Sequence, residues 1–198
     1  MIVLGDAAGT VRLLDGATGR QCSKPLRGHV GRITSVMLAG LADGPVIISG
    51  GKDGTIRVWD LRRSSYLFYR VSSIQRETPL RGHEGPVTSV ALGSFNSQPA
   101  IISGGEDGTI RLWDLASGTE RGRPLRGHSR PVTSVVVGTF ADREMVISGG
   151  QDGTVRIWNL DGSEMSRVHV GCNIRALAFL EPQAVVAAAV QGLLLLQF

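Results

Sequence analysis

Cysteines, aromatic side chains and long apolar runs are all scarce in this chain of 198 residues. Its two cysteines, Cys22 and Cys172, cannot form a disulfide framework, and they do not have the Cys-x-x-Cys spacing of a zinc site. No segment reaches the ~20 unbroken apolar residues of a membrane-spanning helix. The start, MIVLGDAAG, lacks the basic and apolar regions of a secretory signal. We therefore expect a cytoplasmic protein with no membrane association, no bound metal and no cofactor.

Clusters of basic charge are also lacking. The chain has 19 arginines and only 2 lysines, and its formal net charge is +4. These basic residues are spread along the sequence, whereas a nucleic-acid interface needs a contiguous basic face. The charge distribution therefore favours a solvated basic surface and argues against a nucleic-acid partner.

Glycine, in contrast, is abundant, with 27 residues, nearly twice the usual ~7%. Hydrophobic residues make up 42% of the chain and charged residues 19%, which argues against disorder. A chain of this size can bury roughly 70% of the surface that its unfolded form exposes. This composition favours many short strands joined by tight turns.

Three segments of the chain repeat one pattern without gaps. They read GHVGRITSV…IISGGKDGTIRVWDL, GHEGPVTSV…IISGGEDGTIRLWDL and GHSRPVTSV…VISGGQDGTVRIWNL. They begin at Gly28, Gly82 and Gly127, and each has 30 positions between its His and its Trp. The spacing between copies is 54 and then 45 residues, and the nine extra residues lie between Trp59 and His83. Such repetition is typical of an array of similar structural units.

Partial copies of the pattern flank the three complete ones. The first residues match the second half of a unit, with Ala8 in the place of Asp and Leu14 in the place of Trp. The last residues match the first three quarters of a unit, with Gln191 in the place of Asp and Gln197 in the place of Trp.

Each complete unit contains four short strand signals. In the second unit the signals are β-branched or apolar runs bounded by Gly, Pro and Asp, and they cover residues 87–92, 99–103, 109–114 and 119–124. Asp-Gly pairs at 53–54, 107–108 and 152–153 separate the second and third strands, and Asp-Gly tolerates the positive φ of a tight hairpin. The sequence therefore predicts an all-β chain built from four-stranded antiparallel meanders.

The spacing of GH, SGG-x-DGT and W-D or W-N resembles the WD-repeat family of β-propellers over nearly the whole chain. The resemblance implies about four and a half blades in an incomplete or open propeller. We expect a single region, residues 1–198, divided into a partial blade, three blades and a second partial blade at 1–27, 28–81, 82–126, 127–169 and 170–198. A piece of a larger propeller is the preferred interpretation, and a distorted five-blade ring and a ring of two chains remain alternatives.

Each complete unit carries His, Ser, Asp and Trp at constant offsets. A Ser, His and Asp together suggest a hydrolase, but a hydrolase needs one such triad beside an oxyanion hole, and no Gly-x-Ser-x-Gly motif occurs. The family resemblance implies instead a hydrogen-bonded chain inside every blade. The structural sets are His29, Ser49, Asp53 and Trp59; His83, Ser103, Asp107 and Trp113; and His128, Ser148, Asp152 and Trp158. The fourth histidine, His169, has no such partners and is expected to be a loop residue.

Two regions are candidates for binding a partner. In the family, the loops before the first strand and before the turn Asp share one rim, and here that rim carries both signs of charge, which favours a protein or peptide. The predicted rim residues are Arg32, Lys52, Glu84, Glu106, Arg130 and Gln151. The nine-residue insertion offers a second patch, Tyr66, Phe68 and Tyr69, on the opposite rim. The alternatives are solvated loop ends at the first region and a lengthened hairpin that packs its own rings at the second.

The terminal strands are a further candidate surface. VVAAAV and LLLLQF carry no charge, and an incomplete propeller exposes unpaired strand edges, so the isolated chain is expected to self-associate.

The sequence therefore predicts a non-enzymatic scaffold for protein–protein interaction, from the WD-repeat portion of a larger regulatory or signalling protein. One alternative is an enzyme or small-ligand propeller that uses the central channel. The expected innermost strands ITSVML, VTSVAL, VTSVVV and IRALAF hold few acids or histidines, which disfavours it. A nonfunctional gene fragment is another alternative.

Overall fold

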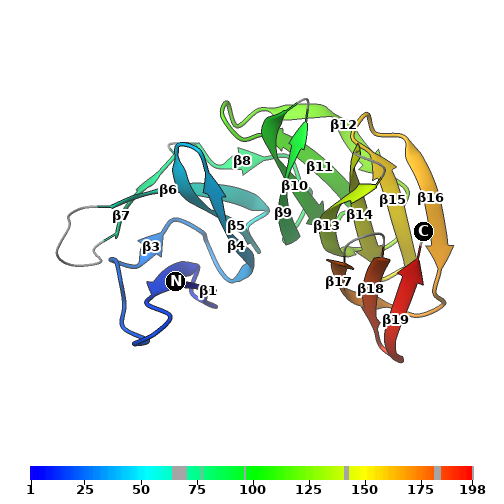
Figure 1. Cartoon of the computed structure of the whole chain (residues 1–198), viewed down its shortest axis with the longest axis horizontal. Coiled ribbons are helices and arrows are strands. Elements are labelled where there is room, and N and C mark those ends of the chain that lie inside the picture. Colours follow the sequence, from blue (N-terminus) through cyan, green and yellow to red (C-terminus); the bar gives the residue numbers. More distant parts are fainter. Residues whose placement is uncertain (64–70, 77, 96, 141–142, 181–183, 198) are drawn as a thin grey trace.

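The chain folds into antiparallel β-sheets that stand side by side along an open arc (Figure 1). The computed structural model describes residues 1–63, 71–76, 78–95, 97–140, 143–180 and 184–197. All regular secondary structure in these ranges is β-strand. The predicted all-β propeller architecture is confirmed.

Each sheet follows the chain order of its strands. The first contains β1 (Ile2–Gly5), β2 (Thr10–Leu14) and β3 (Leu26–Arg27). The second contains β4 (Ile33–Leu41), β5 (Gly44–Gly51), β6 (Thr55–Arg63), β7 (Val71–Gln75) and β8 (Leu80–Arg81). The third contains β9 (Val87–Phe95), β10 (Gln98–Gly105), β11 (Thr109–Asp114) and β12 (Glu120–Arg126). The fourth contains β13 (Val132–Phe140), β14 (Arg143–Gly150), β15 (Thr154–Asn159) and β16 (Glu164–His169). The fifth contains β17 (Ile174–Leu180), β18 (Ala184–Ala189) and β19 (Gly192–Gln197).

The second sheet departs from the predicted four strands because its outer strand is interrupted. Both β7 and β8 pair with β6, β7 along residues 59–63 and β8 along residues 55–56. The strand β6 is also three residues longer than β11 in the third sheet. The extra residues before His83 therefore lengthen the β6–β7 hairpin.

The core lies between consecutive sheets. The strands β10, β11, β14 and β15 carry runs of buried residues on both faces, because each sheet has a neighbour on either side. Separate apolar clusters fill the spaces between sheets; one of them joins Val87 and Val90 of the third sheet to Ile48 and Ile56 of the second. The innermost strands β4, β9, β13 and β17 contact one another in sequence. This arrangement explains why the strands read as continuous apolar runs and do not alternate.

A Thr-Ser pair on each of the inner strands β4, β9 and β13 fastens that sheet to the next. Thr88 Oγ1 donates a hydrogen bond to the carbonyl of Val132 at 2.6 Å, and Ser89 Oγ accepts one from the amide of Val135 at 3.1 Å. Thr133 and Ser134 repeat both bonds to Ile174 and Leu177 of the fifth sheet, at 2.8 and 3.1 Å. Thr34 and Ser35 do the same from the second sheet to the third.

A glycine on the second strand of each unit allows the close approach of the next sheet. A β-carbon at Gly104 would lie 2.6 Å from Val132 Cγ1, and one at Gly149 would lie 2.5 Å from Ile174 Cγ2. Gly5 and Gly50 are approached in the same way by Ile33 and Val87, at 2.4 and 2.7 Å. We call Gly5, Gly50, Gly104 and Gly149 the landing glycines. They explain the first Gly of the SGG motif, which strand propensity alone would disfavour.

The arc leaves the ring open. The first and fifth sheets lie at its opposite ends, with the N-terminus and the C-terminus far apart in this view (Figure 1). Within the described residues, the first sheet lacks an innermost strand and the fifth lacks an outermost one. The chain therefore forms the expected incomplete propeller, and the distorted five-blade ring is not formed.

Candidate partner-binding rim

A chain of hydrogen bonds runs through the His, Ser, Asp and Trp of each complete unit. In the third sheet, His83 Nδ1 lies 3.0 Å from Asp107 Oδ2, and His83 Nε2 lies 2.8 Å from Ser103 Oγ. The indole of Trp113 donates to the same Ser103 Oγ at 2.9 Å. The second and fourth sheets repeat these bonds within 0.2 Å through His29, Ser49, Asp53 and Trp59, and through His128, Ser148, Asp152 and Trp158.

The pKa of the carboxylate is lowered in each set, and burial lowers the pKa of the His83 and His128 imidazoles. Burial raises the pKa of Asp53, but hydrogen bonds from the amide of Val30, His29 and Thr55 outweigh burial and lower the pKa to about 2. Burial lowers the pKa of His83, and this effect outweighs the negative charge of Asp107, which raises it. With Nδ1–H donating to the carboxylate, Nε2 accepts from the serine hydroxyl. Donation therefore runs in one direction, from Trp to Ser to His to Asp.

This geometry resembles that of a hydrolytic triad, but the serine cannot reach a substrate. Ser49, Ser103 and Ser148 are each 0% exposed. Each hydroxyl also accepts a hydrogen bond from an indole. The sets can therefore satisfy buried polar groups and fix the loops that carry His and Asp, but they offer no accessible nucleophile.

Two glycines in each complete unit make the loops around the set possible, one by leaving space and one by its backbone conformation. A β-carbon at Gly105 would lie 2.4 Å from His83 Nδ1 and 2.6 Å from Asp107 Oδ1, so the second Gly of SGG leaves room for the pair. Gly108 of the Asp-Gly turn has φ of 73°. Its backbone conformation is one that glycine adopts without strain, as the sequence predicts.

Both loops of each unit meet at one edge of the sheet. The amide of Lys52 donates to the carbonyl of Arg32 at 2.8 Å, and Glu106 and Gln151 bond in the same way to Pro86 and Pro131 at 2.9 Å. The six predicted rim residues are all exposed: Arg32, Lys52, Glu84, Glu106, Arg130 and Gln151. Within each unit, the two residues predicted for the rim therefore lie on loops that are bonded together.

The rim is continuous from one unit to the next. A β-carbon at Gly54 in the second sheet would lie 2.9 Å from the carbonyl oxygen of Gly85, in the loop that leads into the third. A β-carbon at Gly108 would lie 3.0 and 3.3 Å from the carbonyl oxygens of His128 and Arg130. Turn and loop therefore touch at each junction, and the exposed side chains stand on one connected backbone surface.

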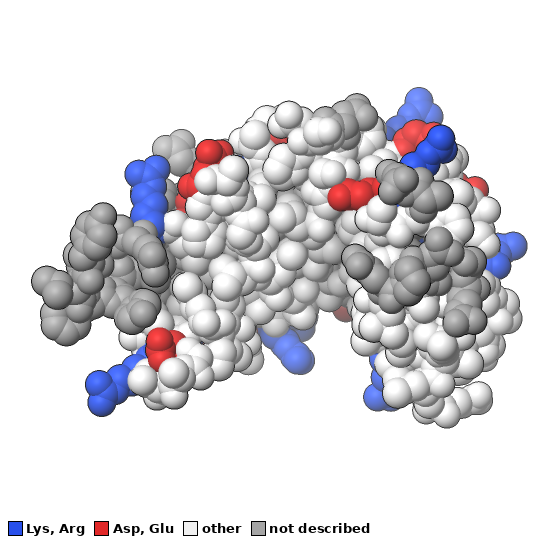
Figure 2. Space-filling model, in the orientation of Figure 1, with Lys and Arg blue, Asp and Glu red and all other residues white. Residues whose placement is uncertain are grey.

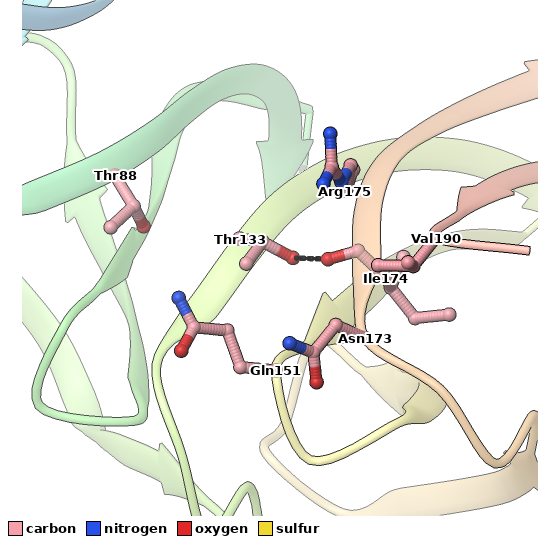
Figure 3. A pocket seen from close by; sticks show the side chains of 7 residues that line it. All are labelled: Thr88, Thr133, Gln151, Asn173, Ile174, Arg175 and Val190. Atoms are coloured by element: carbon pink, nitrogen blue, oxygen red, sulfur yellow. Dashed lines mark hydrogen bonds between the residues drawn. The ribbon is translucent and has the colours of Figure 1, made fainter.

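A cavity of about 430 Å³ is lined by residues of the third, fourth and fifth sheets (Figure 3). Its lining includes Gln151 of the rim, together with Asn173 and Arg175 at the start of the fifth sheet. The sequence analysis missed Arg175, because it searched the inner strands only for acids and histidines. The signal was present, since Arg175 stands where the aligned repeats have Thr88 and Thr133.

Charge is distributed over the molecule without a patch of one sign on the face drawn in Figure 2. Basic and acidic side chains lie near the edge of the arc, some of them next to one another, and most of its middle is uncharged. This view agrees with the mixed charges of the rim.

The remaining predicted surfaces are the aromatic patch and the terminal edges. Tyr66, Phe68 and Tyr69 lie outside the described residues. At the C-terminal end, β19 pairs only with β18, and Leu193, Leu194 and Leu195 are 77%, 40% and 58% exposed. The described part of β19 is therefore an apolar strand with one edge unpaired.

The described residues contain no helix that is long and apolar enough to cross a membrane. Within the same residues, no group of three or more His, Cys, Asp or Glu side chains is placed to hold a metal ion.

Comparison with known families gives matches over most of the chain. The family model described as "WD domain, G-beta repeat" matches residues 20–60, 74–114 and 119–159. In each matched segment the model begins with the outer strand of one sheet and ends with the Trp strand of the next. The three copies found in the sequence are therefore three members of this repeat.

Curated relatives align with part of the chain. Protein ROOT INITIATION DEFECTIVE 3 of Arabidopsis thaliana is 32% identical over 118 residues, which is 59% of this chain and 26% of that protein. Small ribosomal subunit protein RACK1y of Oryza sativa subsp. japonica is 36% identical over 46% of this chain and 24% of its own length. Apoptotic protease-activating factor 1 of Danio rerio is 30% identical over 59% of this chain and 8% of its own length. The chain thus spans about a quarter or less of these relatives.

Among solved structures, the computationally designed Ika8 protein superposes with a TM-score of 0.71 and 29% sequence identity. The superposition covers 99% of this chain and 55% of Ika8. The arc therefore matches little more than half of that designed protein.

Proposed function

The chain belongs to the WD-repeat family, and from this premise we propose that it is a non-enzymatic platform that binds a protein or peptide along its rim. The observation that carries the proposal is the contrast between fixed and variable positions. The buried His, Ser, Asp and Trp are the same in three units, whereas the exposed residues before each turn Asp are Lys52, Glu106 and Gln151. A rigid scaffold with chemically different loop ends is typical of binding surfaces.

The charges along the rim alternate from unit to unit. The second sheet presents Arg32 and Lys52, the third presents Glu84 and Glu106, and the fourth presents Arg130 with the neutral Gln151. Arg175 of the fifth sheet adds a second positive group beside Gln151. A matching partner is an extended segment with acidic, basic and again acidic side chains, because complementary charge selects the partner and its register.

Catalysis in the central channel is less well supported than the binding of a partner at the rim. The cavity beside Arg175 is lined by hydroxyl, amide, aliphatic and guanidinium groups, and none of its described lining residues is a carboxylate or an imidazole. General acid–base chemistry needs such a group. Arg175 and Gln151 are better suited to hold a carboxylate of a bound peptide.

Three finer points of the proposal concern context. We propose that the platform is part of a larger regulatory or signalling protein, and that it acts in the cytoplasm. Two relatives are small ribosomal subunit proteins by name, which supports the second point. The division of the region at residues 28, 82, 127 and 170, and the self-association of the isolated chain, stay predictions.

The proposal is tested by photo-crosslinking from the rim. A photoreactive phenylalanine analogue at Glu106 is expected to capture a discrete protein from an extract of the source cells, and excess unlabelled chain is expected to compete. The matched position is Ala116, which is exposed in the turn at the opposite end of β11. The charge-reversed competitor Lys52→Glu/Glu106→Lys is expected to compete poorly. Equal capture from Ala116, or full competition by the reversed chain, would contradict the proposal.

A further inference from the structure

The fifth sheet differs from the other four in the residues that would receive a following sheet. The register of β17 and β18 places Ala176 opposite Ala188, as Ser134 is opposite Gly149 and Ser89 is opposite Gly104. Ala188 therefore occupies the position of a landing glycine. Ala176 occupies the position of the serine whose Oγ accepts an amide of the next sheet, which is Ser89 in the third sheet and Ser134 in the fourth.

Ala188 obstructs the approach that the other sheets allow. At all four landing glycines, a β-carbon would lie 2.4–2.7 Å from a side-chain carbon of the next sheet. Ala188 carries that β-carbon. A sheet packed on it in the same geometry would have to move outward, and the packing contacts of the joint would be lost.

A second obstruction lies at the other end of the inner strand. A β-carbon at Gly138 of the fourth sheet would lie 2.5 Å from the ring of Phe179, and one at Gly93 would lie 3.1 Å from Val137. The aligned residue of the fifth sheet is Leu180, which is 47% exposed. A leucine side chain fills the space that a following inner strand would take.

The hydrogen bonds of the joint are also missing. Arg175 replaces the threonine that donates to the next inner strand, and Ala176 has no oxygen to accept an amide, as Ser134 does from Leu177 at 3.1 Å. Both residues are exposed. A docked sheet would bury the guanidinium and leave its own amide without a partner, and both changes disfavour docking.

From these four differences we propose that the sheet of β17, β18 and β19 is an end unit. Its outer face rejects a further WD-repeat sheet in the geometry of the four joints that already connect the five sheets. This inference does not rest on the proposed rim function. It implies that the arc is not extended or closed by docking on this face, whether the incoming sheet comes from this chain or from a second copy. Pairing along the edge of β19 is a separate contact and stays possible.

The test joins one more repeat to the full chain. Residues 115–159, which supply an outer strand followed by three strands of a new sheet, are fused after Phe198. One fusion keeps the native fifth sheet, and the other carries Arg175→Thr, Ala176→Ser, Leu180→Gly and Ala188→Gly. Hydrogen exchange is measured at the added copies of residues 146–148, in the middle strand of the added sheet, whose ladder pairs persist only when that small sheet is packed on a neighbour. Exchange at residues 87–114 shows that the host is folded.

We expect these added amides to exchange at least tenfold more slowly in the four-residue variant than in the native fusion. Equal protection in both fusions would show that the native face accepts a sheet and would overturn the proposal. Rapid exchange in both, with a folded host, would show that these four residues do not govern docking and would overturn it as well.

Discussion

The imidazole of His83 bridges two buried partners, with its Nδ1 3.0 Å from Asp107 and its Nε2 2.8 Å from Ser103. Asp107 also accepts the amide of Glu84 at 2.9 Å and the hydroxyl of Thr109 at 2.8 Å. One carboxylate therefore fixes the loop before the sheet, the turn within it and the tautomer of the histidine.

Asp107→Ala is expected to destabilise the fold. The substitution leaves the buried ring N–H of His83 without its acceptor, at about 1–3 kcal/mol, and also removes the acceptor of the exposed Glu84 amide. Urea unfolding at pH 7.5 measures the change. Glu106→Ala is the matched control, because this neighbour is exposed, and a change within about 0.5 kcal/mol is expected there. An unchanged midpoint for Asp107→Ala would contradict the structural role of the set.

Acidification is expected to weaken the fold in two stages. The pKa values of His83 and His128 are lowered by burial, so the unfolded chain binds protons first and stability falls as the pH drops below about 6.5. The pKa of Asp53, lowered to about 2, adds a loss that begins below about 3.9, where the unfolded carboxyl protonates. Unfolding free energies from pH 8 to pH 3 measure both stages. A constant value between pH 7.5 and pH 5.5 would rule out the first stage.

Gly149→Ala is expected to loosen the joint between the fourth and fifth sheets. Its β-carbon would meet Ile174 at 2.5 Å, and overpacking of this kind costs roughly 1–3 kcal/mol. Hydrogen exchange of the Leu177 amide, which reports the joint, should accelerate. Gly40→Ala is the control, because no atom lies within 4 Å of a β-carbon there. Similar effects of both substitutions would show that the landing position has no special role.

The isolated chain is expected to associate through the edge of β19. Leu193 and Leu195 are exposed on a strand with one partner, and charged residues suppress such pairing. Leu193→Lys/Leu195→Lys should therefore lower the concentration-dependent mass seen by light scattering. Val30→Lys is the control, because Val30 is 79% exposed but lies on the rim. A wild-type chain that remains a monomer at high concentration would refute this prediction.

The repeat pattern predicts the meanders, the Asp-Gly turns and the grouping of His, Ser, Asp and Trp, because these features recur at constant spacing within one unit. The joints between units are not visible in the pattern. Gly149 reads as part of a strand, and only the approach of Ile174 from the next sheet explains it. The same limit concealed Arg175, whose significance depends on a threonine in a neighbouring sheet.

The first sheet shows a further limit of sequence spacing. Ala8 stands in the place of the turn Asp, and spacing alone predicts a turn without a carboxylate. The structure supplies one from two residues earlier, since Asp6 accepts the amides of Ala8 and Thr10 at 2.9 and 2.8 Å. A hydrogen bond can be made from a nearby position, and an alignment by position does not detect it.

The central claim is that the three polar sets are buried struts and that binding occurs at the exposed loops above them. The most direct measurement is hydrogen exchange of the indole N–H groups of the chain's three tryptophans, Trp59, Trp113 and Trp158, by NMR. All three should exchange only on unfolding, and Asp107→Ala should release Trp113 far more than the other two. Exchange of all three indoles at the rate of a free tryptophan would contradict the claim.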